Sequence, residues 1–425
     1  MGGGLIQLVA YGAQDIYLTG QPQITFWKAV YRRHTNFAIE SIQQTVQGRL
    51  AFGSRASFVI TRNGDLLKKL WIQYNPRELL SGVNGNVVAA NIGHTLIDSM
   101  EILIGGQLID RHYGKWLTIW NYLTEPNTDG TQGPINSNGY GPGEGPAGDT
   151  ATNQALPRPT QYNRMAYTHR ANDAVDDCTG APRYAYIPFQ FWFCRNPGLA
   201  IPLIALQYHE VRVNLIFGEY NGITNAPTPT GSEFSNFAVY ADYVYLDTTE
   251  RRQFAQNAHE YLIDQVQLNS DNVNPVINLT FVHPVKELIW VIPPSNAVTV
   301  QTPAGSASPP SSFTSSSSIV PNNYKLIFNG TDRFTERDIT YFTRNQVWDT
   351  HTGFGSVLFP DSIAVYSFAL KPEEHQPSGT CNFSRLDTAQ LSRSNTSPVD
   401  IIDVYAVNYN VLRIMSGMGG LAYSN

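Results

Sequence analysis

The chain has 425 residues, of which 42 % are hydrophobic and 15 % charged, and its formal net charge is −6. The low charged fraction excludes a disordered chain and a coiled coil. The acidic balance argues against general nucleic-acid binding, which depends on an excess of Lys and Arg. Because 34 Gly and 26 Pro interrupt a chain that is 12 % aromatic, we expect many short strands and an all-β fold.

Residues 1–40 predict an extended arm, because glycines interrupt every regular element along it. An isolated arm cannot bury enough apolar surface to offset the conformational entropy it loses on ordering. We therefore expect its apolar side chains to pack on the rest of the chain or on another subunit. The basic cluster 31–34 predicts either a contact with an acidic neighbour, a headgroup or nucleic acid, or ion pairs inside the fold. The candidate contact residues of the arm are Ile6, Leu8, Trp27, Arg32 and Arg33.

Residues 41–246 predict a first β-domain. Residues 115–123 place Trp116, Ile119 and Trp120 at helical spacing. Residues 126–160 hold almost no large apolar side chain, which is typical of a long surface loop. Alternating or β-branched runs predict strands at 57–61, 70–74, 96–104, 184–193, 201–206, 211–217 and 237–246.

Residues 247–259 predict a helical linker, since Asp247 and Glu250 have the spacing of a capping box. We expect the helical spacing to continue from Phe254 to Tyr261. A second β-domain follows at 260–425, and a Ser- and Pro-rich surface loop interrupts it at 303–318. Its predicted strands are 277–282, 287–291, 324–328, 363–370 and 400–409. About eight strands in each half favour a sandwich or a jelly roll.

None of the nine histidines has the spacing of a metal site, and the chain has neither a phosphate-binding loop nor a nucleophile elbow. The sequence therefore predicts no catalytic residue, no cofactor and no metal. Three distant cysteines predict free thiols in a reducing compartment. No segment has the length of a membrane span or the pattern of a secretory signal, so we expect a soluble compartment. Glycosylation sequons begin at Asn278, Asn329, Asn382 and Asn395.

Three runs of sequence carry a family resemblance. The first is 2–38, GGGLIQLVAYGAQDIYLTGQPQITFWKAVYRRHTNFA; the second is 183–217, RYAYIPFQFWFCRNPGLAIPLIALQYHEVRVNLIF. The third comprises DRFTERDITYF from Asp332 and VYSFALKPEEHQPSGTCNFSRLDTAQL up to Leu391. Together these runs resemble the major capsid proteins of the nucleocytoplasmic large DNA viruses, which include phycodnaviruses, iridoviruses and giant amoebal viruses.

The resemblance implies two consecutive eight-stranded jelly-roll barrels with a short linking helix and an extended N-terminal arm. It implies a homotrimer that forms a pseudo-hexagonal capsomer of an icosahedral shell, with neighbouring capsomers, penton proteins, minor capsid proteins and the internal viral membrane as partners. Such a protein is not an enzyme and reads no nucleic-acid sequence. It is expected in the virion after assembly in the host cytoplasm, with its arm on the inner side of the shell.

Two other interpretations are compatible with the sequence. Aromatic-rich β-sandwiches commonly bind sugars, so a carbohydrate-binding tandem jelly-roll protein is the alternative; the two long loops, however, offer only Tyr140 and Phe313 as aromatic side chains. A metal-dependent bicupin enzyme would need two histidines one residue apart, which the chain lacks. A stable trimer favours the capsid protein, and a sugar-binding monomer favours the alternative.

Overall fold

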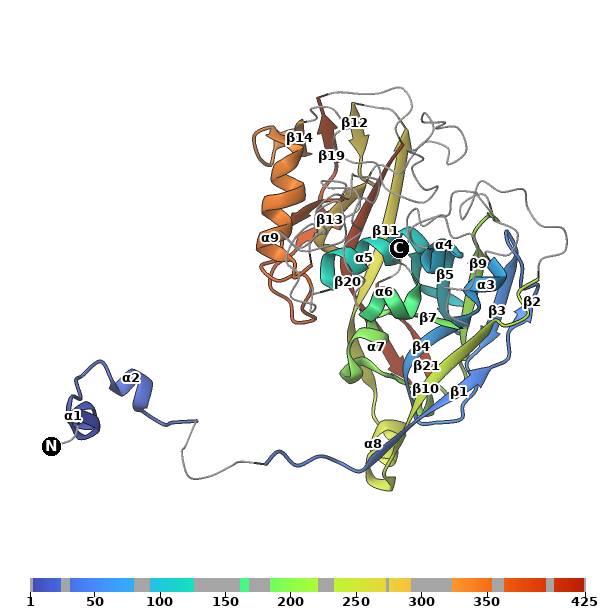
Figure 1. Ribbon diagram of the computed structural model, residues 1–425, viewed down its shortest axis with the longest axis horizontal. Helices are drawn as coiled ribbons and strands as arrows, with labels where there is room; N and C mark the ends of the chain where they lie inside the picture. Colours follow the sequence, from blue (N-terminus) through green and yellow to red (C-terminus); the bar gives the residue numbers. More distant parts are fainter. Residues whose placement is uncertain are drawn as a thin grey trace, which may run out of the picture. The chain divides into compact units, whose positions relative to one another are not determined.

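The computed structural model describes residues 3–23, 31–79, 92–125, 161–167, 184–220, 233–272, 275–291, 323–353, 363–394 and 401–423 (Figure 1). The chain forms two compact units, residues 1–37 and residues 38–425, which are described one after the other. The two predicted loops, 126–160 and 303–318, lie outside the described residues.

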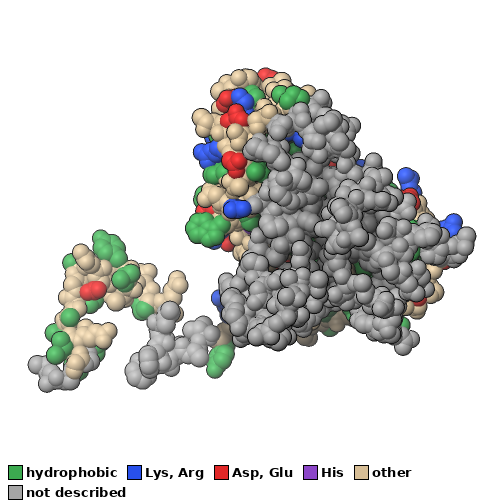
Figure 2. All heavy atoms as spheres, turned by 45° about the horizontal axis from the view of Figure 1, so that its top comes forward, with side chains coloured by type: hydrophobic (Ala, Val, Ile, Leu, Met, Phe, Trp, Pro, Cys, Tyr) green, Lys and Arg blue, Asp and Glu red, His purple; other side chains and the backbone are tan. Residues whose placement is uncertain are grey.

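The N-terminal unit contains two short helices, α1 (Gly3–Val9) and α2 (Ile16–Thr19). The prediction that glycines exclude regular structure here was therefore wrong. The turn between the helices is closed by Asp15, whose Oδ2 accepts a hydrogen bond from Gly12 N at 2.7 Å. The apolar side chains of both helices are exposed (Figure 2), and Leu8 keeps 78 % of its surface.

Two facing sheets form the first sandwich. Both have five strands; we call the sheet that contains β1 the larger sheet, because its counterpart in the second sandwich has six strands. Its strands run in the order β1 (Phe37–Gln44), β10 (Ala238–Leu246), β4 (Leu66–Tyr74) and β7 (Ala185–Pro188), with β8 (Ile201–Pro202) beside β4. The opposite sheet has the order β2 (Gln47–Gly48), β3 (Arg55–Val59), β9 (Val211–Phe217), β5 (Ile97–Ile104) and β6 (Gln107–Tyr113). Alternate residues of both sheets point inward and share one core.

The second sandwich repeats this strand order. Its larger sheet runs β11 (His259–Asn272), β20 (Ile401–Met415), β13 (Pro284–Val291) and β17 (Ile363–Ser367), with β18 (Cys381–Asn382) and β21 (Met418–Leu421) at its edges. The opposite sheet runs β12 (Val276–Asn278), β19 (Ala389–Arg393), β14 (Asn323–Phe328) and β15 (Thr331–Asp332), with β16 (Arg337–Asp338) beside β14. In both halves the first strand, β1 or β11, pairs with a strand from the end of that half, β10 or β20, and this strand pairs on its other side with β4 or β13. This is the connectivity of a jelly roll.

The two jelly rolls differ from the prediction in their closure. Within the described residues each pair of sheets stays open along its edges, and no closed barrel forms. The count of eight strands in each half stays a prediction, because several strands are pieces of only two residues.

Three hairpins have two-residue turns that end in glycine. Gly105-Gly106, Asn329-Gly330 and Ser416-Gly417 each join two paired strands, and both residues of every turn have positive φ. These are type I′ turns, whose twist matches that of the flanking strands and which favour Gly and Asn.

The helices in the described residues are short. Besides α1 and α2 they are α3 (Pro76–Leu79), α4 (Ile92–Thr95), α5 (Gly114–Thr124), α6 (Gln161–Ala166), α7 (Trp192–Arg195), α8 (Thr248–Gln256) and α9 (Gln346–Thr350). Helix α5 confirms the predicted helix at 115–123. Helix α8 lies within the predicted helical linker 247–259. Its cap Asp247 accepts from Thr248 N rather than from the third residue, so the predicted capping-box bond was wrong, and Tyr261, which was expected at helical spacing, lies in strand β11.

Four predicted strands were also wrong in part. Two of them end early, β12 at Asn278 instead of 282 and β17 at Ser367 instead of 370. Residues 189–193 leave the sheet after β7 and enter α7, and residues 203–205 form a 3-10 turn after β8. Both stretches are buried, so their apolar runs reflect burial rather than strand alternation. No helix in the described part of the chain has the length and hydropathy needed to cross a membrane.

Candidate functional site

The two jelly rolls meet through helix α5, which belongs to the first and packs on the larger sheet of the second (Figure 1). Trp116 and Trp120 are 1 % and 7 % exposed, and the Trp116 ring lies 5.5 Å from that of Tyr405 on β20. We call this contact the inter-sandwich core. Two buried tryptophans contribute several kcal/mol of apolar burial, so the core is large enough to fix the two jelly rolls against each other.

A buried cation lies beside the inter-sandwich core. The Lys286 side chain on β13 is 1 % exposed, and its Nζ lies 3.2 Å from Oδ2 of Asp264 on β11. The same Nζ donates a hydrogen bond to the Pro372 carbonyl at 2.9 Å. Arg195 joins this group from α7, with its guanidinium 4.5 Å above the Trp120 ring and 3.9 Å from Asp264. Paired charges at this depth avoid the cost of an isolated buried ion.

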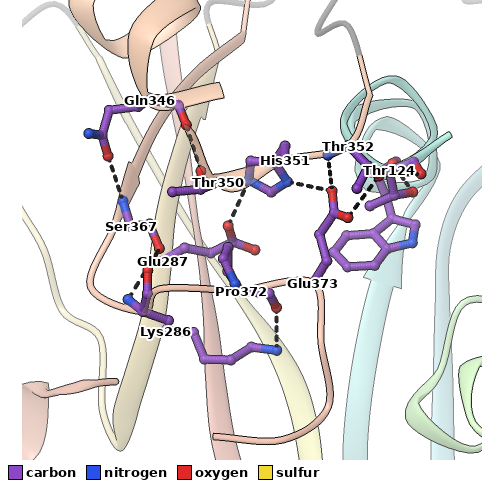
Figure 3. A network of polar contacts seen from close by, with 12 residues as sticks. Thr124, Lys286, Glu287, Gln346, Thr350, His351, Thr352, Ser367, Pro372 and Glu373 are labelled. Atoms are coloured by element: carbon purple, nitrogen blue, oxygen red, sulfur yellow. Dashed lines mark hydrogen bonds and ion pairs between the residues drawn. The ribbon is translucent and has the colours of Figure 1, made fainter. Parts of the chain in front are cut away.

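A second polar group, the His351 network, consists of the buried His351 and Glu287, the partly buried Glu373 and the exposed Thr352 (Figure 3). His351 Nε2 lies 3.0 Å from Glu287 Oε2, and its Nδ1 lies 3.0 Å from Glu373 Oε1. The side chains of His351 and Glu287 are both 0 % exposed. Since both ring nitrogens face carboxylate oxygens at ion-pair distance, the imidazole is the charged form.

The pKa values in this network follow from these contacts. Burial by itself lowers the pKa of His351, but the charges of Glu287 and Glu373 and their hydrogen bonds outweigh it and raise the pKa to about 9. Burial likewise opposes ionisation of Glu373, but the hydrogen bonds from His351 and Thr352 lower its pKa below the ordinary value. Both groups are therefore charged at neutral pH.

The network reaches the first jelly roll at the end of α5. Thr352 N donates to Glu373 Oε1 at 2.9 Å, and Thr352 Oγ1 lies 3.1 Å from the Thr124 carbonyl. The next residue, Gly353, donates its backbone N–H to the Leu123 carbonyl at 2.7 Å. These contacts satisfy carbonyls that the last turn of a helix leaves free.

This arrangement is suited to holding surfaces in place rather than to chemistry. The buried charges neutralise one another, so none of them is free to act on a substrate. No group of His, Cys, Asp and Glu side chains in the described ranges could hold a metal ion.

Sequence reasoning missed the buried charges. The available signal was Lys286-Glu287, two charged residues inside the otherwise apolar strand β13. The adjacent acidic residues Glu373 and Glu374 have different partners: Glu373 contacts His351, whereas Glu374 pairs with Lys371 on the surface, with 2.9 Å between Nζ and Oε1.

The predicted contact residues all belong to the N-terminal unit. Ile6 and Leu8 are exposed on α1, and Arg32 and Arg33 are exposed in the non-helical stretch before β1. Trp27 lies outside the described residues.

Three of the four sequon asparagines are described, and each accepts a hydrogen bond through its side-chain oxygen. Asn278 accepts from Gln390 Nε2 at 2.9 Å, and Asn382 accepts from Ser384 N at 3.0 Å. Asn329, in the type I′ turn, accepts from the backbone of Asp387 and Thr388. Asn395 lies outside the described residues.

Comparisons with known proteins agree along the whole chain. Residues 25–247 match the family "Major capsid protein N-terminus", and residues 250–420 match "Large eukaryotic DNA virus major capsid protein". The chain is 45 % identical to a major capsid protein of Pyramimonas orientalis virus and 38 % identical to that of Paramecium bursaria Chlorella virus 1, with 100 % of both chains covered in each comparison. Among solved structures, a chain of the PBCV-1 virus capsid is 32 % identical, with a TM-score of 0.72 over 94 % of this chain and 100 % of that one.

Proposed function

Since the chain belongs to the major capsid proteins of large eukaryotic DNA viruses, we propose that three copies form one pseudo-hexagonal capsomer of the shell. The protein is a structural component of the virion capsid and not an enzyme. The observation that carries the proposal is the repeated strand order, which gives every copy two similar bodies. Six similar bodies from three copies fill a six-sided outline, and cyclic symmetry closes the ring.

The fixed geometry between the two jelly rolls supports this assembly. A ring closes only if each copy presents its two bodies at one angle, and the inter-sandwich core and the His351 network restrict that angle. The carbohydrate-binding alternative has no comparable support, because the matched families and relatives are capsid proteins.

Light scattering coupled to size-exclusion chromatography tests the proposal. We expect a species of about three times the 47.2 kDa chain mass. A protein that stays monomeric at micromolar concentration would count against the trimer.

The N-terminal arm is proposed to lie on the inner side of the shell, where it contacts neighbouring capsomers, minor capsid or penton proteins and the internal membrane. The exposed apolar side chains of α1 and α2, including Ile6 and Leu8, support this role because they lack cover in their own unit. Trp27, Arg32 and Arg33 remain predicted contacts. A chain without residues 2–30 should form trimers but not shells; normal shells from that chain would refute the role.

Two further expectations belong to the life of the virus. Assembly in the host cytoplasm is proposed from the family resemblance alone. Glycans at Asn278, Asn329, Asn382 or Asn395 would add mass to the protein from virions, and an intact mass equal to that of the bare chain would exclude them.

A further inference from the structure

The repeated strand order places two helical segments at equivalent positions. Helix α5 follows β6 directly and precedes β7. In the second jelly roll, a π-helical turn (Tyr341–Asn345) continues into α9, and this segment lies between β16 and β17. Along the chain, each segment therefore follows a strand of the smaller sheet, β6 or β16, and precedes an edge strand of the larger sheet, β7 or β17.

The two segments differ in what they cover. On α5, Leu117 packs into the core of the first jelly roll, while Trp116 and Trp120 pack on the larger sheet of the second jelly roll of the same chain. On the second segment, Phe342 packs into its own core, but Trp348 keeps 81 % of its surface exposed. Figure 2 shows hydrophobic side chains exposed along the edge of the second jelly roll where Figure 1 places α9.

A matching surface exists on the first jelly roll. On the outer face of its larger sheet, the Trp71 ring stacks on Tyr240 with centroids 4.3 Å apart and meets the Tyr186 ring edge-on at 5.4 Å. All three side chains are only partly buried. We call these three residues the aromatic face.

The aromatic face corresponds to the surface that α5 covers on the second jelly roll. There the neighbouring strands β20, β13 and β17 place Tyr405, Ile289 and Val365 side by side, beneath the tryptophans of α5. In the first jelly roll, β10 and β4 place Tyr240 directly opposite Trp71, and Tyr186 comes from β7. Strands β10, β4 and β7 take the same places in the strand order of the first larger sheet as β20, β13 and β17 take in the second, so the two surfaces are equivalent.

We propose that Trp348 of one copy packs on the aromatic face of the next copy. The inference rests on the proposed trimer and names its contact: the packing of α5 within the chain is repeated between chains by α9. The contact joins two different surfaces, as a cyclic ring requires. The occupant is a second copy because the chain already covers the equivalent surface of its second jelly roll with its own helix.

Charge and rigidity agree with this contact. Asp349 follows Trp348 and is exposed, and Lys69 is exposed two residues before Trp71 on the same face of β4. The α5 contact has an ion pair at its edge as well, with 3.0 Å between Lys115 Nζ and Asp403 Oδ2. His351 follows α9 directly and its ion pair with Glu373 holds the end of this helix in place. Trp348 is therefore ordered before binding, which lowers the entropy cost of association.

The test measures the trimer dissociation constant by sedimentation and native mass spectrometry. Trp348→Ala should raise it by about 30-fold or more, as expected for a central aromatic anchor, and should leave the circular dichroism spectrum unchanged. Tyr208→Ala is the matched control, because Tyr208 is 76 % exposed and belongs to neither surface. Asp349→Lys should weaken the trimer, and adding Lys69→Asp should restore it.

Each outcome decides between the proposals. A wild-type chain that forms no trimer overturns the proposed trimer itself. A wild-type trimer with an unchanged dissociation constant in the Trp348→Ala variant overturns only this contact, as does equal weakening by Tyr208→Ala. Failure of Lys69→Asp to rescue Asp349→Lys overturns the pairing of the two surfaces.

Discussion

Replacing His351 with alanine tests the His351 network most directly. The change leaves the Glu287 carboxylate, which is 0 % exposed, without its cation. Breaking a buried pair by removing one partner costs about 3 to 5 kcal/mol, because the remaining charge stays desolvated. We expect the free energy of unfolding at pH 7 to fall by about that amount.

The pKa of His351 gives an independent magnitude. The structure raises this pKa from 6.5 to about 9. Each pKa unit corresponds to about 1.4 kcal/mol of preference for the charged form, so the network stabilises the folded imidazolium by about 3 kcal/mol. The two arguments agree on a large effect from one side chain.

Urea denaturation followed by tryptophan fluorescence measures this effect. Glu374→Ala is the control, because its pair with Lys371 is exposed and the denaturation midpoint should stay unchanged. The double variant Glu287→Leu with His351→Leu should recover part of the stability lost in His351→Ala. Apolar residues of similar volume replace the two fully buried groups, and Glu373 keeps its hydrogen bonds from Thr352. A loss below about 1 kcal/mol in His351→Ala, or a double variant that is no more stable, would refute the reasoning.

Three further predictions use the same measurement. The contribution of His351 to the free energy of unfolding is fully present below about pH 6.5 and disappears as the pH rises through 9, so His351→Ala should abolish this alkaline decline. The pKa of Glu373 is lowered, so its contribution disappears as the pH falls below about 4.5. Trp120→Ala should cost about 3 to 5 kcal/mol, because it empties the inter-sandwich core, and a loss under 1 kcal/mol would mean that α5 does not join the jelly rolls. Gly105→Ala should cost about 1 to 3 kcal/mol, since a Cβ at φ +59° would lie 2.3 Å from His209 Nδ1, whereas Gly106→Ala meets no atom within 4 Å and should cost less; equal costs would contradict the role of the close contact.

Local pattern was sufficient for the parts of the fold that local physics determines. The predicted strand 211–217 is β9 to the residue, because alternate side chains point to the core and to the outside. The helix at 115–123 was predictable from the spacing of its tryptophans, although its partner was not. Spacing shows which face of a helix is apolar but not which sheet covers that face.

The errors in the sequence-based prediction have a common physical origin. Residues 189–193 and 203–205 are apolar because they are buried, and a continuous apolar run fits a buried turn as well as a strand. The His351 network was beyond sequence reasoning for another reason. Glu287 lies 64 positions before His351, and only the sheet register of β13 and the path of the chain after α9 bring them together.

The longest strand pair has a consequence for how the molecule unfolds. Strands β11 and β20 pair without interruption from His259 to Asn272, and the ends of this ribbon lie in different cores: Ile414 in that of the first jelly roll and Ile402 in that of the second. Unfolding of either core would break hydrogen bonds between β11 and β20 that the other core still holds in place. Heating should therefore produce one calorimetric transition instead of two. Such a subunit unfolds as a single cooperative unit, and neither jelly roll would fold independently if the chain were cut between them.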